Sequence, residues 1–135
     1  MSHSTPLGSV ERAWDGPWNR VRTESFEASF LPNPDDDLDL VCKVDLEVRL
    51  LDGSRWSATV FTVAEVARLM VTWAGSDEAL GGRYFWCSDG LIVREPGVSN
   101  MTDVIAGLLD SGEFTQISSD STATDQTRAL REMIF

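Results

Sequence analysis

The chain has 135 residues and a formal charge of −11 at pH 7, from 22 acidic and 11 basic residues. This length suits one domain with a single core, and no segment approaches the ~20 consecutive apolar residues that a membrane-spanning helix needs. An acidic surface repels phosphate backbones and anionic membranes, so we expect no binding to nucleic acid or membrane, whereas encounter with a basic protein is favoured.

The N-terminus and the cysteines bear on the cellular location. Residues 1–8 contain no basic stretch followed by an apolar run, which predicts no secretory signal and a cytoplasmic protein. Cys42 and Cys87 fall inside predicted strands and lack the CxxC spacing of a zinc site, so we expect two buried thiols. A disulfide between them remains an alternative if their strands are neighbours.

The N-terminal part of the chain combines a polar lead with two tryptophans. Trp14 and Trp18 flank a Gly-Pro turn, and they either pack onto the core or form an exposed adhesive patch. The rarity of large exposed apolar patches favours packing. Residues 26–30 then alternate apolar and polar side chains, which predicts a short strand, and prolines with a run of aspartates make 31–37 a loop.

The clearest alternation lies between residues 38 and 50. Apolar residues share one parity, and charged residues occupy most of the other. This pattern predicts a strand with one buried face and one face in water. A return strand is expected over residues 56–60.

The loop between these two strands poses a conflict between turn chemistry and burial. Asp52 and Gly53 suggest a two-residue turn, which would place Trp56 opposite Arg49. A three-residue loop would place Trp56 opposite Leu50 and keep all apolar residues on one side. We therefore expect a longer or bulged loop.

A helix is predicted to begin at Thr62. Thr62 and Glu65 have the spacing of a capping box, in which each side chain accepts from the other residue's backbone amide. Apolar residues recur at helical spacing up to Ala74, and Gly75 is suited to end the helix.

The stretch around Asp89-Gly90 predicts a β-hairpin. Its first strand is aromatic, over residues 84–86, and its second is aliphatic, over residues 91–93. Tyr84 and Trp86 are either a platform for a ligand or partner, or core residues whose polar tips find hydrogen bonds. Their spacing favours the core.

A second helix follows, with Asn100 as its cap and Gly112 at its end. Beyond it, Phe114 and Ile117 are expected to pack against the core, and residues 126–134 fit a short terminal helix.

Together these elements predict an α+β fold. It is an antiparallel β-sheet of about five strands, in the order β-β-β-α-β-β-α, with two main helices packed on one face. The single domain is expected over residues 23–117, after a flexible or clipped N-terminal segment, 1–22, and before a polar tether and short C-terminal helix, 118–135.

Few residue patterns suggest catalysis. The only histidine is His3, in the polar lead, so sites built on Ser-His, Cys-His or His-metal pairs lack their central residue. The aspartates of 35–39 do not match a calcium loop and are expected to form a solvated turn. We predict no enzyme activity, no cofactor and no metal site.

Three stretches carry a resemblance to known proteins. They are residues 45–62 (DLEVRLLDGSRWSATVFT), 81–94 (GGRYFWCSDGLIVR) and 111–114 (SGEF). The chain resembles small uncharacterised bacterial α+β proteins that share a YFWxSD hairpin, some of which are immunity-type partners of secreted toxins. The resemblance implies the fold unit over about residues 44–117 and brings no active-site residues.

These observations rank three functions. The first is a non-catalytic acidic protein that docks on or neutralises a basic partner, most concretely a toxin-immunity protein. Its expected partner contacts are acidic residues and apolar anchors, namely Asp35, Asp36, Asp37, Asp39, Asp45, Glu47, Trp14, Trp18 and Phe135. The alternative is a self-associating structural or adaptor module, a homodimer through a strand edge or the C-terminal residues. A further alternative is a small carboxylate-based enzyme, which needs a deep pocket holding a carboxylic acid of raised pKa.

Overall fold

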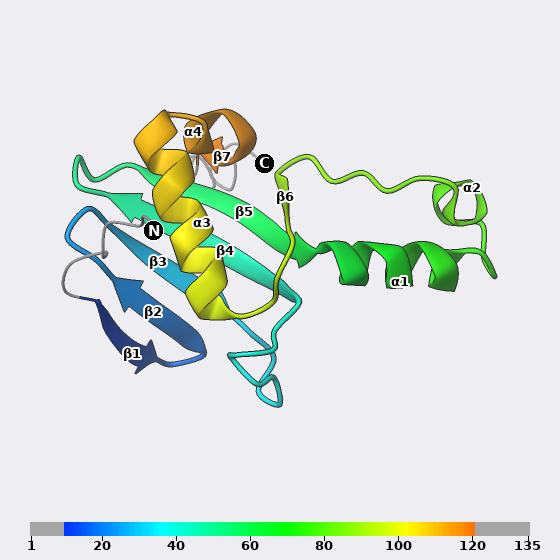
Figure 1. The fold of residues 1–135 in the computed structure, drawn as a ribbon, viewed down its shortest axis with the longest axis horizontal. Coiled ribbons are helices and arrows are strands. Elements are labelled where there is room, and N and C mark those ends of the chain that lie inside the picture. The colour runs from blue at the N-terminus through cyan, green and yellow to red at the C-terminus, as the bar shows by residue number, and fades with distance from the viewer. Residues whose placement is uncertain (1–9, 121–135) are drawn as a thin grey trace, which may run out of the picture.

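A computed structural model describes residues 10–120 of the chain. Six strands form one sheet in sequence order: β1 (Glu11–Asp15), β2 (Trp18–Arg22), β3 (Phe26–Leu31), β4 (Lys43–Leu50), β5 (Arg55–Thr62) and β6 (Gly90–Val93). A two-residue strand, β7 (Ser119–Asp120), also pairs with β5. The helices are α1 (Val63–Trp73), α2 (Ala79–Gly82), α3 (Val98–Ser111) and α4 (Phe114–Ile117). Figure 1 shows α3 lying across one face of the sheet.

The core lies between α3 and the inner face of the sheet, by which we mean the face that α3 covers. Alternate residues of β4 point into it, and Val48 is fully buried. From α3 and α4 come Met101, Ile105 and Phe114, each with no exposed surface. The predicted alternation is therefore confirmed from residue 43 onward. Residues 38–40 form a turn instead, and Leu40 is exposed.

Three residues, 51–53, separate Leu50 from Ser54, which pair at the end of the β4–β5 hairpin, so the loop is longer than two residues, as the burial argument predicted. The Leu50 amide donates to the Ser54 carbonyl at 2.9 Å, and Gly53 takes the left-handed conformation that such a loop requires. Trp56 pairs with Val48 and not with Leu50, because the loop begins one residue earlier than expected. Trp56 therefore faces an apolar residue in the observed register, as it would have in the expected one.

The sheet begins at Glu11, so residues 11–22 belong to it and precede the domain start expected at residue 23. β1 and β2 form an antiparallel hairpin around Gly16 and Pro17, and the Arg12 guanidinium donates to the Ser99 hydroxyl of α3. Packing of both tryptophans onto the core was a wrong prediction: Trp14 on edge strand β1 is 59% exposed, and Trp18 is half-buried.

The predicted hairpin at Asp89-Gly90 is also wrong. Residues 84–86 form no strand, and β6 pairs parallel with β5, with Gly90 opposite Thr59. The turn signal is present, since the Gly90 amide donates to the Cys87 carbonyl, but the chain leaving it pairs with the free edge of β5. A parallel pair needs a crossover, and α1 with the segment after it supplies one.

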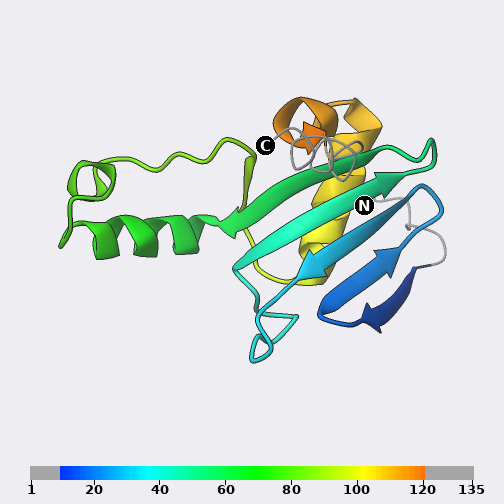
Figure 2. The same cartoon turned by 180° about the vertical axis from the view of Figure 1, so that it is seen from behind.

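Of the two long helices within residues 10–120, only α3 packs on a face of the sheet. α1 continues the direction of β5 beyond the end of the sheet, and residues 74–89 run back beside it (Figures 1 and 2). We call residues 63–89 the arm and residues 74–89 the return segment. The fold is thus α+β with a mixed sheet, and the expected antiparallel sheet with two helices on one face is corrected in both respects.

Cys42 and Cys87 are free, half-buried thiols just outside the strands. The predicted terminal helix over residues 126–134, and Phe135, lie outside the described residues. Within residues 10–120, none of the helices has the length and apolar character to cross a membrane.

Candidate interaction surfaces

Four of the predicted partner contacts lie on the loop between β3 and β4. Two of their carboxylates hold the loop itself: Asp36 accepts from the Asn33 amide, and Asp37 accepts from the Asp39 amide, both at 2.9 Å. Asp35, Asp37 and Asp39 are exposed, and Asp36 is half-buried. The result is a folded acidic loop.

The start of α3 fixes this loop in place. The Gly97 amide donates to the Val41 carbonyl and the Val98 amide to the Leu38 carbonyl, both at 2.9 Å. Gly97 has a φ of +101°, and a Cβ there would lie 2.7 Å from the Asp39 carbonyl oxygen. The acidic loop is therefore presented on a rigid support, at the end of the sheet from which the arm projects (Figure 1).

The other two predicted acidic contacts lie on the outer face of the sheet, opposite α3. Asp45 accepts from the Thr59 hydroxyl at 3.1 Å, and Glu47 pairs with Ser29 on one side and Ser57 on the other. None of the helices in the described part of the chain lies on this face, as Figure 2 shows. The six predicted carboxylates are thus divided between a loop and a sheet face.

Arginines balance the acidic residues elsewhere on the outer face. Arg20 bonds Asp15 at 2.9 Å and Ser29 at 2.8 Å, and Arg22 bonds Glu27 at 3.0 Å. Exposed ion pairs of this kind contribute little stability. This face therefore carries mixed charge, and the acidic loop is the clearer acidic surface.

The arm concentrates the exposed apolar side chains. Of the ten large hydrophobic residues exposed within residues 10–120, five lie on the arm: Val63, Val71, Leu80, Tyr84 and Trp86. Trp86 is 76% exposed and Val71 75%. Large apolar surface left in water on a projecting segment is typical of a site that another protein covers.

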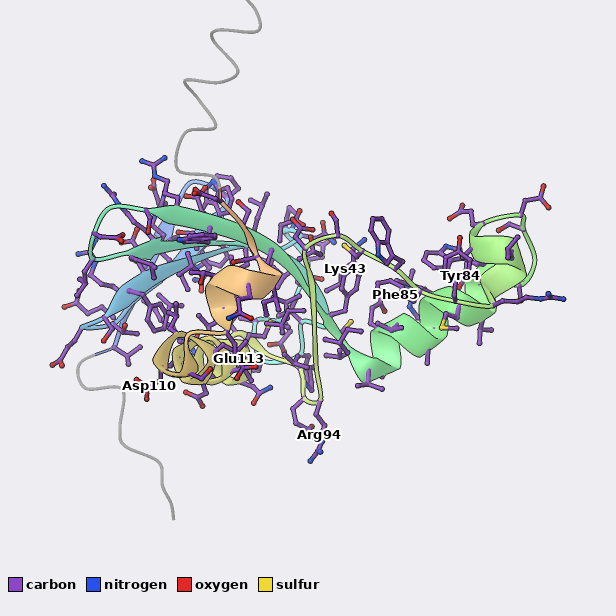
Figure 3. All side chains as sticks on the ribbon, turned by 90° about the horizontal axis from the view of Figure 1, so that it is seen from above. Lys43, Tyr84, Phe85, Arg94, Asp110 and Glu113 are labelled. Carbon is purple, nitrogen blue, oxygen red and sulfur yellow. The ribbon has the colours of Figure 1, made fainter. Side chains whose placement is uncertain are left out.

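Phe85 holds the return segment against α1. Its ring stacks on Trp73, with centroids 6.0 Å apart, and meets Phe61 edge-on at 4.9 Å. Because successive side chains of an extended segment alternate in direction, Tyr84 and Trp86 then point away from this contact. Figure 3 shows Tyr84 and Phe85 on the return segment alongside α1.

A close backbone contact supports the same packing nearer the tip. Gly82 has a φ of +81°, and a Cβ on it would lie 1.9 Å from the Met70 carbonyl oxygen. Ala79 and Leu80 also take left-handed conformations, which cost side-chain-bearing residues about 1–2 kcal/mol each. The tip of the arm is therefore a tight turn with a defined backbone conformation.

An ion pair fixes the base of the arm. Thr62 accepts from the Glu65 amide as predicted, but the other half of the capping box is absent, because the Thr62 amide donates to the Cys42 carbonyl. The Glu65 carboxylate instead accepts two hydrogen bonds from Arg68, both at 2.7 Å. The buried Glu65 carboxylate is therefore paired with Arg68 of the same helix and not with the Thr62 amide.

Two pKa shifts follow from this cluster. The hydrogen bonds from Arg68 lower the pKa of Glu65, although its burial acts in the opposite direction. Burial, and then the adjacent Glu65 carboxylate, raise the pKa of the Cys42 thiol, so the thiol is not activated as a nucleophile. The carboxylate-enzyme alternative calls for an acid of raised pKa. Within residues 10–120, hydrogen bonds lower the pKa of both Glu65 and Asp52, which is the opposite direction.

Sequence reasoning missed the arm and assigned Tyr84 and Trp86 to the core. The signal available was the composition of α1, in which only Glu65, Arg68 and Thr72 are polar. A helix that is apolar on nearly all sides is normally buried. Within residues 10–120 only the return segment packs along this one, and much of its surface is exposed.

Comparisons of the chain with protein-family models, with curated proteins and with solved structures found no match.

Proposed function

We propose that this chain is a non-catalytic binding module that docks on a basic protein in the cytoplasm, most concretely as the immunity partner of a toxin. The observation that carries the proposal is the exposure of Tyr84 and Trp86 on a projecting arm that Phe85 fastens from behind. Aromatic anchors on a rigid support are the residues that dominate binding energy at protein interfaces.

The charge of the chain supports a basic partner. A net charge of −11 attracts a basic protein over a distance of about one Debye length, roughly 8 Å at physiological salt. The acidic loop places three exposed aspartates at the end of the sheet from which the arm projects. In this arrangement the loop speeds encounter and the arm supplies anchors that slow dissociation.

The test is capture of the tagged protein's partner from its native cells, followed by binding measurements with the purified pair. We expect one basic protein at a 1:1 ratio, with an affinity that falls as salt rises. Trp86→Ala should weaken binding by at least about 30-fold, the cost of losing an anchor worth about 2 kcal/mol or more.

Trp14, which the sequence offered as a partner contact, lies on β1 at the far edge of the sheet from the arm, so the proposed interface leaves it out. Trp14→Ala is therefore the matched control, because Trp14 is also an exposed tryptophan. It should leave the affinity unchanged. Replacing Asp35, Asp37 and Asp39 by asparagine should slow association and flatten its salt dependence, with little effect on dissociation. Equal losses in Trp14→Ala and Trp86→Ala, or an affinity that rises with salt, would sink the proposal.

A further inference from the structure

The sequence around residues 84–87 carries a strand signal that the fold leaves unused. Tyr84, Phe85 and Trp86 are residue types that favour extended backbone. The return segment passes through residues 84–87 with no helix or turn, alongside α1 (Figure 3), and the neighbouring strand β6 begins only at Gly90. A run of strand-forming residues is thus extended but belongs to no strand of the described sheet.

The backbone of this segment is unpaired. In the described part of the chain, the amides of residues 84–87 donate to no acceptor, and among their carbonyls only that of Cys87 accepts, from the Gly90 amide at 3.3 Å. The Arg83 amide before the segment and the Asp89 carbonyl after it are both bonded. Backbone polar groups that a fold leaves unpaired are bonded by water or by another chain.

The composition of the segment leaves it open to pairing with another strand. Natural edge strands carry charged residues or prolines that discourage such pairing. β1, at one end of the sheet, has three charged residues, Glu11, Arg12 and Asp15, among its five. Residues 84–87 contain neither a proline nor a residue that is charged at neutral pH. This segment is therefore less protected than the β1 edge.

The side chains of the segment indicate what an added strand should carry. Phe85 is half-buried against the rings of Trp73 and Phe61. Tyr84 and Trp86, on the other side, are 50% and 76% exposed. Side chains directly opposite each other in paired strands have Cβ atoms about 4.5–5.5 Å apart, so every second residue of an added strand would lie beside these two rings. Lysine or arginine there would make cation–π contacts, which suits a partner of an acidic chain.

We infer that the partner adds an extended basic strand to residues 84–87, with backbone hydrogen bonds along one edge of the segment. The inference rests on the proposed function for a basic partner, and it adds the mode of binding. Backbone bonds supply affinity in strand addition, and the spacing of alternate side chains supplies specificity. Because alternate residues of a strand bond to the same neighbour, the added strand bonds either residues 84 and 86 or residues 85 and 87.

The first test uses a short peptide of alternating lysine and valine as the probe, added to the intact, isotope-labelled chain and followed by NMR. The same peptide with every backbone amide methylated is its control, because it keeps the side chains and charges but cannot pair as a strand. The unmethylated peptide should bind at least about 10-fold more tightly, since each backbone hydrogen bond changes an equilibrium about fivefold.

Hydrogen exchange in the same complex shows which amides pair. Exchange should slow at residues 84 and 86 or at residues 85 and 87, and not at the other two. Equal binding of the two peptides, shifts confined to the acidic loop, slowing at all four amides, or no binding at millimolar peptide would each overturn the inference.

Proline variants test the same pairing with the captured partner. Proline removes a backbone amide as well as the side chain, whereas alanine removes only the side chain, so the ratio of the two affinities reports the amide. Either Trp86→Pro should bind about fivefold or more weaker than Trp86→Ala, or Cys87→Pro should do so relative to Cys87→Ala, but not both, because the two amides point to opposite edges. Thermal melting checks that each variant is folded. A proline penalty at both positions, or at neither, would contradict strand addition.

The two proposals fail separately. If no basic protein is captured but the peptide binds and slows alternate amides, the proposed function fails and the segment still accepts a strand. If a basic partner depends on Trp86 but no alternate pattern appears, the partner docks on the arm through side chains alone, and only strand addition fails.

Discussion

Phe85→Ala should open the arm without unfolding the domain. Phe85 joins the return segment to Trp73 and Phe61 through two ring contacts, each worth about 0.5–1.5 kcal/mol beyond burial. Its half-buried ring also loses part of the 3–5 kcal/mol or so that a fully buried phenylalanine contributes. We therefore expect a loss of about 2–3 kcal/mol, which raises the population of the open arm about 30- to 150-fold.

Native-state hydrogen exchange measures this opening directly. Amides of residues 63–89 should exchange faster by that factor, while amides of β3, β4 and β5, which lie in the core under α3, should keep their protection. Phe85→Leu is the control, since it keeps apolar volume but removes the aromatic contacts, and it should show about a third of the effect. Equal acceleration in the arm and the central strands would mean that the arm unfolds only with the whole domain, and the reasoning would fail.

Two further perturbations test other parts of the arm. The pKa of Glu65 is lowered in the folded state, so its contribution to stability is present at neutral pH and is lost as pH falls through that pKa; urea midpoints should decline less in acid for Glu65→Gln than for the native chain. Gly82→Ala should destabilise the arm by about 2 kcal/mol or more, because its Cβ would strike the Met70 carbonyl, whereas Gly53→Ala, also at positive φ but with no atom within 4 Å, should cost only about 1 kcal/mol. Equal thermal shifts for the two alanines would contradict the close contact.

The sequence predicted best where one face of an element meets the core and the other meets water. β4 and β5 satisfy that condition, so alternation gave their strands and burial gave a three-residue loop against the Asp-Gly turn signal. The cap spacing of Thr62 and Glu65 correctly predicted the start of α1, and Gly75 lies close to its end. In these places local pattern and global packing agree.

Prediction failed at the segment around residues 84–93, for an identifiable reason. An Asp-Gly turn between aromatic and aliphatic runs is a local signal, and the pairing of β6 with β5 is a contact between residues about 30 positions apart. Once α1 carries the chain away from the sheet, β6 returns beside β5, the strand that α1 follows, and pairs with its free edge. The aromatic run is then left on the arm. Local reading therefore assigned Tyr84 and Trp86 to the core, when they are exposed.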